Sequence, residues 1–449
     1  MPKSYAELPE IHPPEHIGWT GQVPTYLAEM ALEHGPLFRW RMRDDPDSPF
    51  EILFMVGPEA NRFVMHTHRD HFSHDQGWTP IVGEWMGHGL LNMDPPEWTL
   101  HRRMMNPAFT SAYLAAYLPI MQRVIDARTR DWPDGGEIDL YHEAREITFD
   151  IAAEALAGFR SGAPVDKLRE LFYTLIRGPD LANETWEQFL ERRTQVIAEL
   201  DGMLLPLIAE RKRALEAGGV SEQLRDVLGM IVDARDDHGQ PLDDEQILAH
   251  VKILLVAGHE TTTTLSTWTL FLLATHPEYL RRVRAELDPV VGDVNGLVSY
   301  EAIRGLKVLD NVVKEAGRLY SPVISVPRGV VKDFEFAECH VPAGVQVRLS
   351  LAACHRLPHV FANPDIFDPE RFEPPREEDK RAPYALVTFG GGPRVCIGMG
   401  FAQEEIKAFV AHVLRRHRLE IVNPSEVIHA DWLVGFLPNG CRTRVTALR

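Results

Sequence analysis

The stretch FGGGPRVCIG occupies residues 389–398 and directly precedes a segment with helical periodicity at 401–417. Its glycines let the backbone approach a flat ligand or adopt positive φ around the cysteine sulfur. Cys396 lies just before the expected helix start, where free N–H groups and the helix dipole stabilise a thiolate. The stretch therefore predicts a cysteine that stays ionised.

The cysteines of the chain are too few for a disulfide framework and lack the pair that a zinc site needs. The chain contains only Cys339, Cys354, Cys396 and Cys441, with no C-x-x-C pair. A lone thiolate cannot complete a zinc site, but it suits the single proximal ligand of a haem iron. The alternative is a buried structural cysteine in a glycine-rich turn, since free cysteines are often buried.

The stretch resembles the cysteine loop of the cytochrome P-450 superfamily, F-x-x-G-x-R-x-C-x-G. Its fixed positions are all matched, by Phe389, Gly392, Arg394, Cys396 and Gly398. The resemblance implies a mainly α fold with small β-sheets, a long central helix over the haem, and haem b (iron protoporphyrin IX) as cofactor. Cys396 would be the metal ligand, with Phe389, Arg394 and Gly398 around the cofactor.

Residues 243–275 predict that long helix, because the segment lacks proline and is apolar on nearly every face. Asp243 and Gln246 resemble a capping box at its start. The run AGHETT at 257–262 resembles the family's A/G-G-x-E/D-T-T motif. The resemblance places Ala257 at the haem and makes Glu260 and Thr261 a catalytic proton relay, with a threonine hydroxyl bending the helix. The alternative is an ordinary threonine-rich helix with Glu260 facing solvent.

Two further motifs resemble the family's buried charge network. Glu315 and Arg318 share one helix face at a spacing of i, i+3, as in the family's E-x-x-R helix. Arg371 belongs to PERF at 369–372, which resembles the family's P-E-R-F segment. The resemblance implies that these three residues hold the cysteine loop. Exposed helical charges are the alternative.

The two haem propionates need cationic or N–H donors from separate parts of the chain. Trp98 and Arg102 resemble the family's W/H-x-x-x-R pair. Arg328 follows Arg318 by ten residues, where the family often has a propionate-binding arginine. Arg394, two residues before Cys396, completes the expected set.

Helical periodicity dominates the chain, and the strand-like stretches are few and short. The family motifs run in order over residues 95–400, and we expect residues 1–449 to form a single haem domain. The expected helices are 118–132, 147–159, 190–215, 243–275, 309–319 and 401–417, and the expected strands are 37–42, 50–56, 326–331 and 346–349.

Composition excludes several other classes. With 47 basic and 65 acidic side chains the net charge is −18, which disfavours binding to nucleic acid. The first seventeen residues lack a signal peptide's apolar core, and no apolar run approaches the roughly 20 residues of a membrane span. We expect a soluble, cytoplasmic monomer without a membrane anchor. His66, His68, His71 and His74 could bind a second metal, but their spacing fits no metal signature and a polar surface is the favoured interpretation.

The resemblance implies a haem-thiolate monooxygenase acting on an apolar small molecule. A ferredoxin or flavodoxin with its NAD(P)H reductase would supply electrons, because the 51 residues after Gly398 cannot hold a reductase domain. A peroxide-driven or isomerising haem-thiolate enzyme and a non-catalytic haem sensor are the alternatives. By family position the substrate pocket would include Val256, Val323, Ile324 and Leu433. Cations that could receive an acidic electron donor, or simply complement a helix dipole, are Arg102, Arg103, Lys407, Arg415, Arg416 and Arg418.

Overall fold

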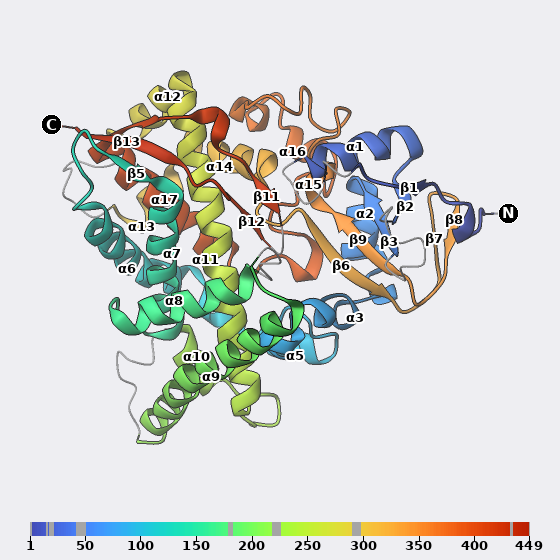
Figure 1. Cartoon of the computed structure of the whole chain (residues 1–449), viewed down its shortest axis with the longest axis horizontal. Helices are drawn as coiled ribbons and strands as arrows, with labels where there is room; N and C mark the ends of the chain where they lie inside the picture. Colours follow the sequence, from blue (N-terminus) through green and yellow to red (C-terminus); the bar gives the residue numbers. More distant parts are fainter. Residues whose placement is uncertain are drawn as a thin grey trace.

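The computed structural model describes residues 2–14, 17, 22–41, 51–177, 183–217, 226–289, 298–431 and 434–448. Helix α11 runs through the middle of the molecule, with most other helices on one side and the largest sheet on the other (Figure 1). The helices are α1 (Val23–His34), α2 (Pro58–Arg62), α3 (His74–Trp78), α4 (Glu84–Met86), α5 (Glu97–Met105), α6 (Ser111–Thr129), α7 (Leu140–Ala157), α8 (Ala163–Ile176), α9 (Trp186–Glu216), α10 (Val227–Asp233), α11 (Asp244–Thr275), α12 (Pro277–Leu287), α13 (Tyr300–Gly305), α14 (Lys307–Leu319), α15 (Leu351–Cys354), α16 (Glu378–Arg381) and α17 (Met399–Arg416).

The largest sheet has the strand order β1-β2-β3-β9-β6-β4. Strands β3 and β9 pair in parallel, whereas β6 pairs with β9 and β4 in antiparallel fashion. A smaller sheet has the order β10-β13-β5. The strands are β1 (Glu10–Ile11), β2 (Leu37–Arg41), β3 (Glu51–Val56), β4 (Phe72–Ser73), β5 (Glu137–Asp139), β6 (Ser325–Val330), β7 (Phe334–Phe336), β8 (Cys339–Val341), β9 (Gln346–Ser350), β10 (His417–Ile421), β11 (Ala430–Asp431), β12 (Gly435–Phe436) and β13 (Arg442–Ala447).

Helix α11 begins with the predicted capping box. The Gln246 N–H donates to Asp243 Oδ1 at 2.8 Å, and the Asp243 N–H donates to Gln246 Oε1 at 3.2 Å. The helix ends before Pro277, which starts α12. Its middle packs closely on α7, and a Cβ added at Gly258 would lie 3.0 Å from Leu156 Cδ1. Small residues at this contact therefore let the two helices approach closely.

The predicted mainly α fold with small sheets is confirmed. All six predicted helices are present, and most begin a few residues earlier than expected. The predicted strands also appear, although residues 42 and 50, at the ends of two of them, lie outside the described residues. No helix in the described part of the chain is long and apolar enough to span a membrane.

Candidate active site

The cysteine loop is shaped by glycines at two positions that need them. Gly390 and Gly392 have φ of 73° and 65°, which L-residues rarely adopt. A Cβ at Gly392 would lie 2.3 Å from the Met65 carbonyl oxygen. The Cys396 N–H donates to the Phe389 carbonyl oxygen at 2.9 Å, which closes the loop directly before α17. The predicted position of Cys396 just ahead of a helix is thus confirmed.

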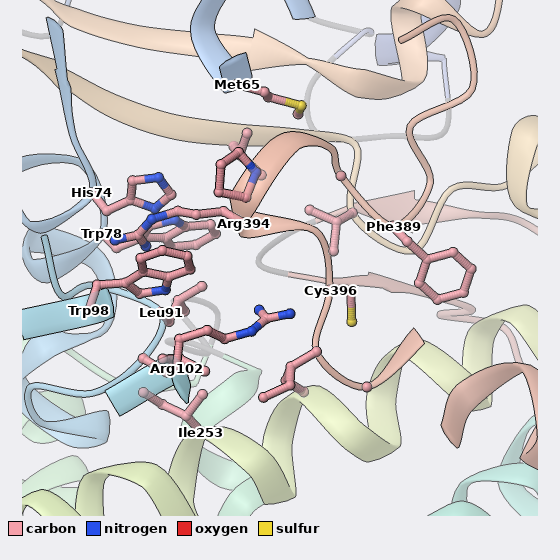
Figure 2. A pocket seen from close by; sticks show the side chains of 18 of the residues that line it. Met65, His74, Trp78, Leu91, Trp98, Arg102, Ile253, Phe389, Arg394 and Cys396 are labelled. Atoms are coloured by element: carbon pink, nitrogen blue, oxygen red, sulfur yellow. The ribbon is translucent and has the colours of Figure 1, made fainter. Parts of the chain in front are cut away.

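A cavity of about 1060 Å³ lies between this loop and α11. The Cys396 side chain projects toward α11 in Figure 2. Cys396 lies inside the protein, and the part of its side chain that is accessible faces the cavity. Every residue predicted to bind the cofactor lines this cavity, namely Trp98, Arg102, Ala257, Arg328, Phe389, Arg394, Cys396 and Gly398.

The environment of the Cys396 thiol differs from the one predicted. Burial raises the pKa of the thiol, while a hydrogen bond from the Gly398 N–H and the positive charge of Arg102 oppose that rise. The stabilising groups expected at the helix start are present, but desolvation outweighs them. A thiolate at this position would be favoured by a further positive charge in the cavity, which a bound metal cation would supply.

Cationic side chains gather at the cavity with few acidic partners. Burial lowers the pKa of Arg328 to about 9 and, together with the charge of Arg328, lowers that of Arg394 to about 9. Arg394 also stands 4.4 Å from the Trp98 ring centre and donates to the Met93 carbonyl oxygen. Within the part of the chain that the structure describes, Asp94 is the carboxylate that acts on both arginines, and its charge favours their protonated forms. The cavity therefore holds an excess of buried positive charge.

These residues fit a haem. Buried arginines with depressed pKa values need anionic partners, and two propionates match that requirement. Arg102, Arg328 and Arg394 would hold the propionates, with the Trp98 N–H as a further donor. The single cysteine at the same cavity matches one axial thiolate. The site thus has the chemistry of a haem-thiolate protein.

Thr261 lies on the cavity side of α11. Its Oγ1 donates to the Ala257 carbonyl oxygen at 2.7 Å, so its lone pairs are left to accept hydrogen bonds. Thr262 and Thr263 make similar bonds to the preceding turn. The predicted back-bonding is confirmed, and it occurs within one continuous helix.

The structure does not bring Glu260 to the cavity. Arg145 of α7 donates to Glu260 Oε1 through Nε at 3.0 Å and Nη2 at 2.5 Å. Burial would raise the pKa of Glu260, but His259 and Arg145 outweigh it and lower the pKa to about 2. Glu260 is therefore a buried carboxylate that faces α7. Both expectations for Glu260 therefore differ from the structure, since its carboxylate neither lies beside Thr261 at the cavity nor faces solvent.

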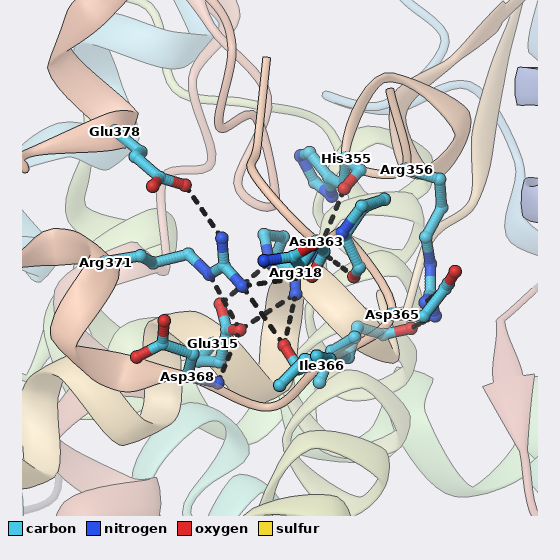
Figure 3. Close-up of polar contacts among 12 residues, drawn as sticks. Glu315, Arg318, His355, Arg356, Asn363, Asp365, Ile366, Asp368, Arg371 and Glu378 are labelled. Carbon is cyan, nitrogen blue, oxygen red and sulfur yellow. Dashed lines mark hydrogen bonds and ion pairs between the residues drawn. The ribbon is translucent and has the colours of Figure 1, made fainter. Parts of the chain in front are cut away.

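The predicted charge network is present and fully buried (Figure 3). Arg318 donates to Glu315 through Nε at 2.7 Å and Nη2 at 2.8 Å. Arg371 Nε donates to Glu315 Oε1 at 2.9 Å, and Arg371 Nη1 donates to Glu378 Oε2 at 2.7 Å. The exposed-charge alternative is thus wrong, and Glu378 is an additional member.

Sequence reasoning assigned no role at the cavity to three further ionisable groups: His74 was expected on a polar surface, and Glu405 and His250 were not singled out. His74 lines the cavity, and burial together with the charges of Arg328 and Arg394 lowers its pKa well below the ordinary value. Glu405 of α17 is buried near Thr262, and desolvation raises its pKa well above the ordinary value. His250 of α11 also lines the cavity. The helical spacing of Glu405 from the buried Phe401 could have indicated its burial.

The predicted substrate pocket is only partly matched. Val256 and Val323 line the cavity, whereas Ile324 packs in a separate hydrophobic cluster with Val56 and Phe54. Leu433 lies outside the described residues. The prediction for Ile324 is therefore wrong, because its side chain packs against residues of β3 and not against the cavity.

Within the described residues the histidine cluster forms no metal site, and two of the expected docking cations face inward. His68 stacks on Phe63, and His71 hydrogen-bonds the Asp333 carbonyl oxygen. Among the described residues, no three His, Cys, Asp or Glu side chains are placed to hold a metal ion. Lys407 is buried against Asp310 at 3.5 Å and Arg102 faces the cavity, so neither belongs to a docking surface.

Comparison with known proteins agrees with this site. The family model for cytochrome P450 matches residues 15–439, so the chain belongs to the cytochrome P450 family. It is a haem-binding oxidoreductase of the monooxygenase class.

Relatives and solved structures support the same family. Cytochrome P450 136 of Mycobacterium tuberculosis is 34% identical over 381 residues, covering 82% of this chain and 74% of the relative. Sterol 14alpha-demethylase of Mycolicibacterium vanbaalenii is 29% identical, covering 85% and 84%. A cyanobacterial cytochrome P450 with bound retinoic acid superposes with a TM-score of 0.82 at 25% identity, covering 100% and 99%.

Proposed function

We propose that this protein inserts one atom of dioxygen into an apolar organic molecule, using electrons from a ferredoxin or flavodoxin and its NAD(P)H reductase. The observation that carries this proposal is the shared cavity of Cys396 and Thr261. A thiolate-ligated haem would supply oxygen activation. The remaining steps fall to side chains of this chain.

The apolar character of the substrate follows from the cavity wall. Leu90, Leu91, Leu254 and Val256 contribute to it, together with Met86. Such a wall binds apolar surface by removing it from water and offers few groups that fix orientation. Polar groups at the cavity therefore gain importance for specificity.

Proton handling would rest on Thr261 rather than on Glu260. The Thr261 hydroxyl faces the cavity, where it can accept a hydrogen bond while its own hydrogen bonds the Ala257 carbonyl oxygen, and it can donate into the cavity once the hydroxyl rotates away from that carbonyl. Glu260 would act as a positioning residue, because its carboxylate ties α11 to α7 through Arg145. This assignment makes Thr261 the residue whose removal uncouples turnover.

The electron donor would be a separate protein, and residues 1–449 would form one haem domain. An acidic donor would still find cations such as the exposed Arg418 on β10. The net charge of −18 argues against broad attraction of an acidic partner, so any docking surface must be local.

The decisive experiment reconstitutes the purified haem protein with a ferredoxin, a flavodoxin and their reductases. A library of apolar compounds is screened for stimulated NADPH consumption, and products are identified by mass spectrometry under ¹⁸O₂. One labelled oxygen in the product supports the proposal. Products formed only with added hydrogen peroxide would instead establish a peroxide-driven enzyme, and stable haem without any product would favour a sensor.

A further inference from the structure

The three consecutive glycines of the cysteine loop differ in what their backbones require. Gly390 and Gly392 have positive φ, whereas Gly391 is extended, with φ of −163° and ψ of 174°. Any residue adopts that extended conformation, so the backbone does not explain a glycine at position 391. The absence of a side chain there must follow from what surrounds Gly391.

The ring of Tyr384 fills the space that a side chain at Gly391 would need. A Cβ added at Gly391 would lie 2.7 Å from Cε1 and 2.8 Å from Cδ1 of that ring. Met65 Sδ, at 3.2 Å, belongs to a flexible side chain that can move aside. The Tyr384 ring and a side chain at position 391 therefore exclude each other, and the two residues form a matched pair.

The surrounding fold holds Tyr384 in place. Its φ of 63° is a left-handed conformation that bulky residues rarely adopt. Its carbonyl oxygen accepts a hydrogen bond from Nδ2 of the fully buried Asn61 at 3.0 Å. The carbonyl oxygen of the next residue, Ala385, accepts one from Cys354 Sγ at 3.4 Å. Such a backbone conformation persists only where surrounding contacts enforce it, so the ring cannot simply turn away from the loop.

The segment that Tyr384 contacts leads directly to Arg394. Gly391 precedes the 3₁₀ turn Gly392–Arg394. A second contact holds this turn at its first residue, where an added Cβ would meet the Met65 carbonyl oxygen. Arg394 reaches the cavity from the end of the turn (Figure 2). A shift of the turn would therefore move the guanidinium group within the cavity.

We propose that Tyr384 is a positioning residue for haem binding, because its ring fixes the turn from which Arg394 reaches a haem propionate. Tyr384 itself is not part of the cavity wall, so it acts only through Gly391 and Arg394. The inference goes beyond the proposed function, since it concerns the hold on the cofactor and requires neither a substrate nor an electron donor.

The test measures the rate of cofactor transfer to apomyoglobin for haem b and for its dimethyl ester, whose esterified propionates cannot form an ion pair with Arg394. Tyr384→Gly should accelerate loss of haem b about tenfold, as one lost net hydrogen bond implies, and should leave the rate for the ester unchanged. Glycine adopts the left-handed φ without strain, so this variant should fold. Tyr384→Phe should match the wild type, because ring carbons make the contact.

A matched control separates the effect of the ring from that of a new glycine. Glu338 also has a left-handed backbone, with φ of 60°, and lies in the turn between β7 and β8. Glu338→Gly should leave both transfer rates unchanged. Equal acceleration for the two cofactors in Tyr384→Gly would show that Tyr384 supports only the fold, and this result would overturn the inference. Unchanged rates for both cofactors in Tyr384→Gly would overturn it as well.

A double variant tests the contact itself. Gly391→Ala places a Cβ against the ring and should accelerate loss of haem b, or prevent its incorporation. Adding Tyr384→Gly removes the ring, so the double variant should hold haem b better than Gly391→Ala alone. A double variant that holds it no better would contradict the inference. Because these measurements record haem loss without turnover, a protein that behaves as expected yet oxidises nothing would refute only the proposed function.

Discussion

The ring Nε2 of His355 accepts a hydrogen bond from the Val387 backbone N–H at 3.0 Å. The carbonyl oxygen of the same histidine accepts from Arg318 Nη1 at 2.9 Å. Val387 precedes Phe389, where the cysteine loop begins. His355 thus links the buried charge network to the loop that carries Cys396.

Replacing His355 by phenylalanine should loosen the cysteine loop. Burial and the charges of Arg318 and Arg356 lower the pKa of His355 to about 3, so its Nε2 is a permanent acceptor. Leaving the buried Val387 N–H unpaired should cost about 1–3 kcal/mol. We expect a lower Tm and faster haem transfer to apomyoglobin.

The control for this prediction is His417→Phe, a buried histidine that packs on Trp132 away from the loop. It should lower Tm without accelerating haem transfer. Equal rates of haem transfer in the two variants would show that His355 has no specific effect on the loop.

Neutralising Glu315 should prevent haem incorporation. Glu315, Arg318 and Arg371 are all fully buried, and Glu315→Gln removes the negative charge that both arginines share. Breaking a buried pair in this way costs about 3–5 kcal/mol. The measurement is haem content per purified chain. Asp368→Asn breaks a partly exposed pair with Arg376 and should retain haem, because such pairs contribute about 0–1 kcal/mol.

Features that depend on residues close in the sequence were predicted correctly, whereas features that depend on contacts between distant residues were not. Capping at Asp243 and the glycines before Cys396 are local signals, and both predictions hold. The partner of Glu260, by contrast, is Arg145, which lies 115 residues away on another helix. Whether Glu260 faces the cavity depends on that contact, and no spacing along α11 reveals it. The role of His355 likewise depends on a distant backbone N–H.

Cys396→His should lose the optical signature of thiolate ligation. Carbon monoxide added to the reduced wild-type protein should give the red-shifted Soret band that a thiolate ligand produces. The variant should lack that band, because an imidazole donates less electron density. Cys354→Ser is the control, since Cys354 is buried and its Sγ donates to the Ala385 carbonyl oxygen. An unchanged band in Cys396→His would exclude Cys396 as the ligand.

Glu260 should make the free energy of unfolding depend on pH between about 2 and 4.5. Its pKa is about 2 in the folded protein against an ordinary 4.5, so its ionised form stabilises the fold at neutral pH. This contribution to the free energy of unfolding, about 3 kcal/mol, is fully present when the pH is above the ordinary pKa of 4.5. It is lost as the pH falls toward the folded-state pKa of about 2.

The test is urea denaturation of wild type and Glu260→Gln across this acid range. The variant should be less stable at neutral pH and should show a flatter pH dependence. Arg145→Leu should lose the same neutral-pH stability, because it leaves the Glu260 carboxylate unpaired. Parallel pH profiles for wild type and Glu260→Gln would contradict the depressed pKa.

Thr261→Ala should uncouple electron consumption from product formation while preserving the fold. Its hydroxyl faces the cavity, and losing it should change stability by only about 1 kcal/mol, whereas losing a group that takes part in proton transfer can slow its step roughly 10²–10⁴-fold. The measurement is product formed and peroxide released per NADPH consumed. Thr263→Val is the matched control, because its hydroxyl lies 2.6 Å from Thr148 Oγ1 on the α7 side, and it should stay coupled. Full coupling in Thr261→Ala would assign this threonine a structural role alone.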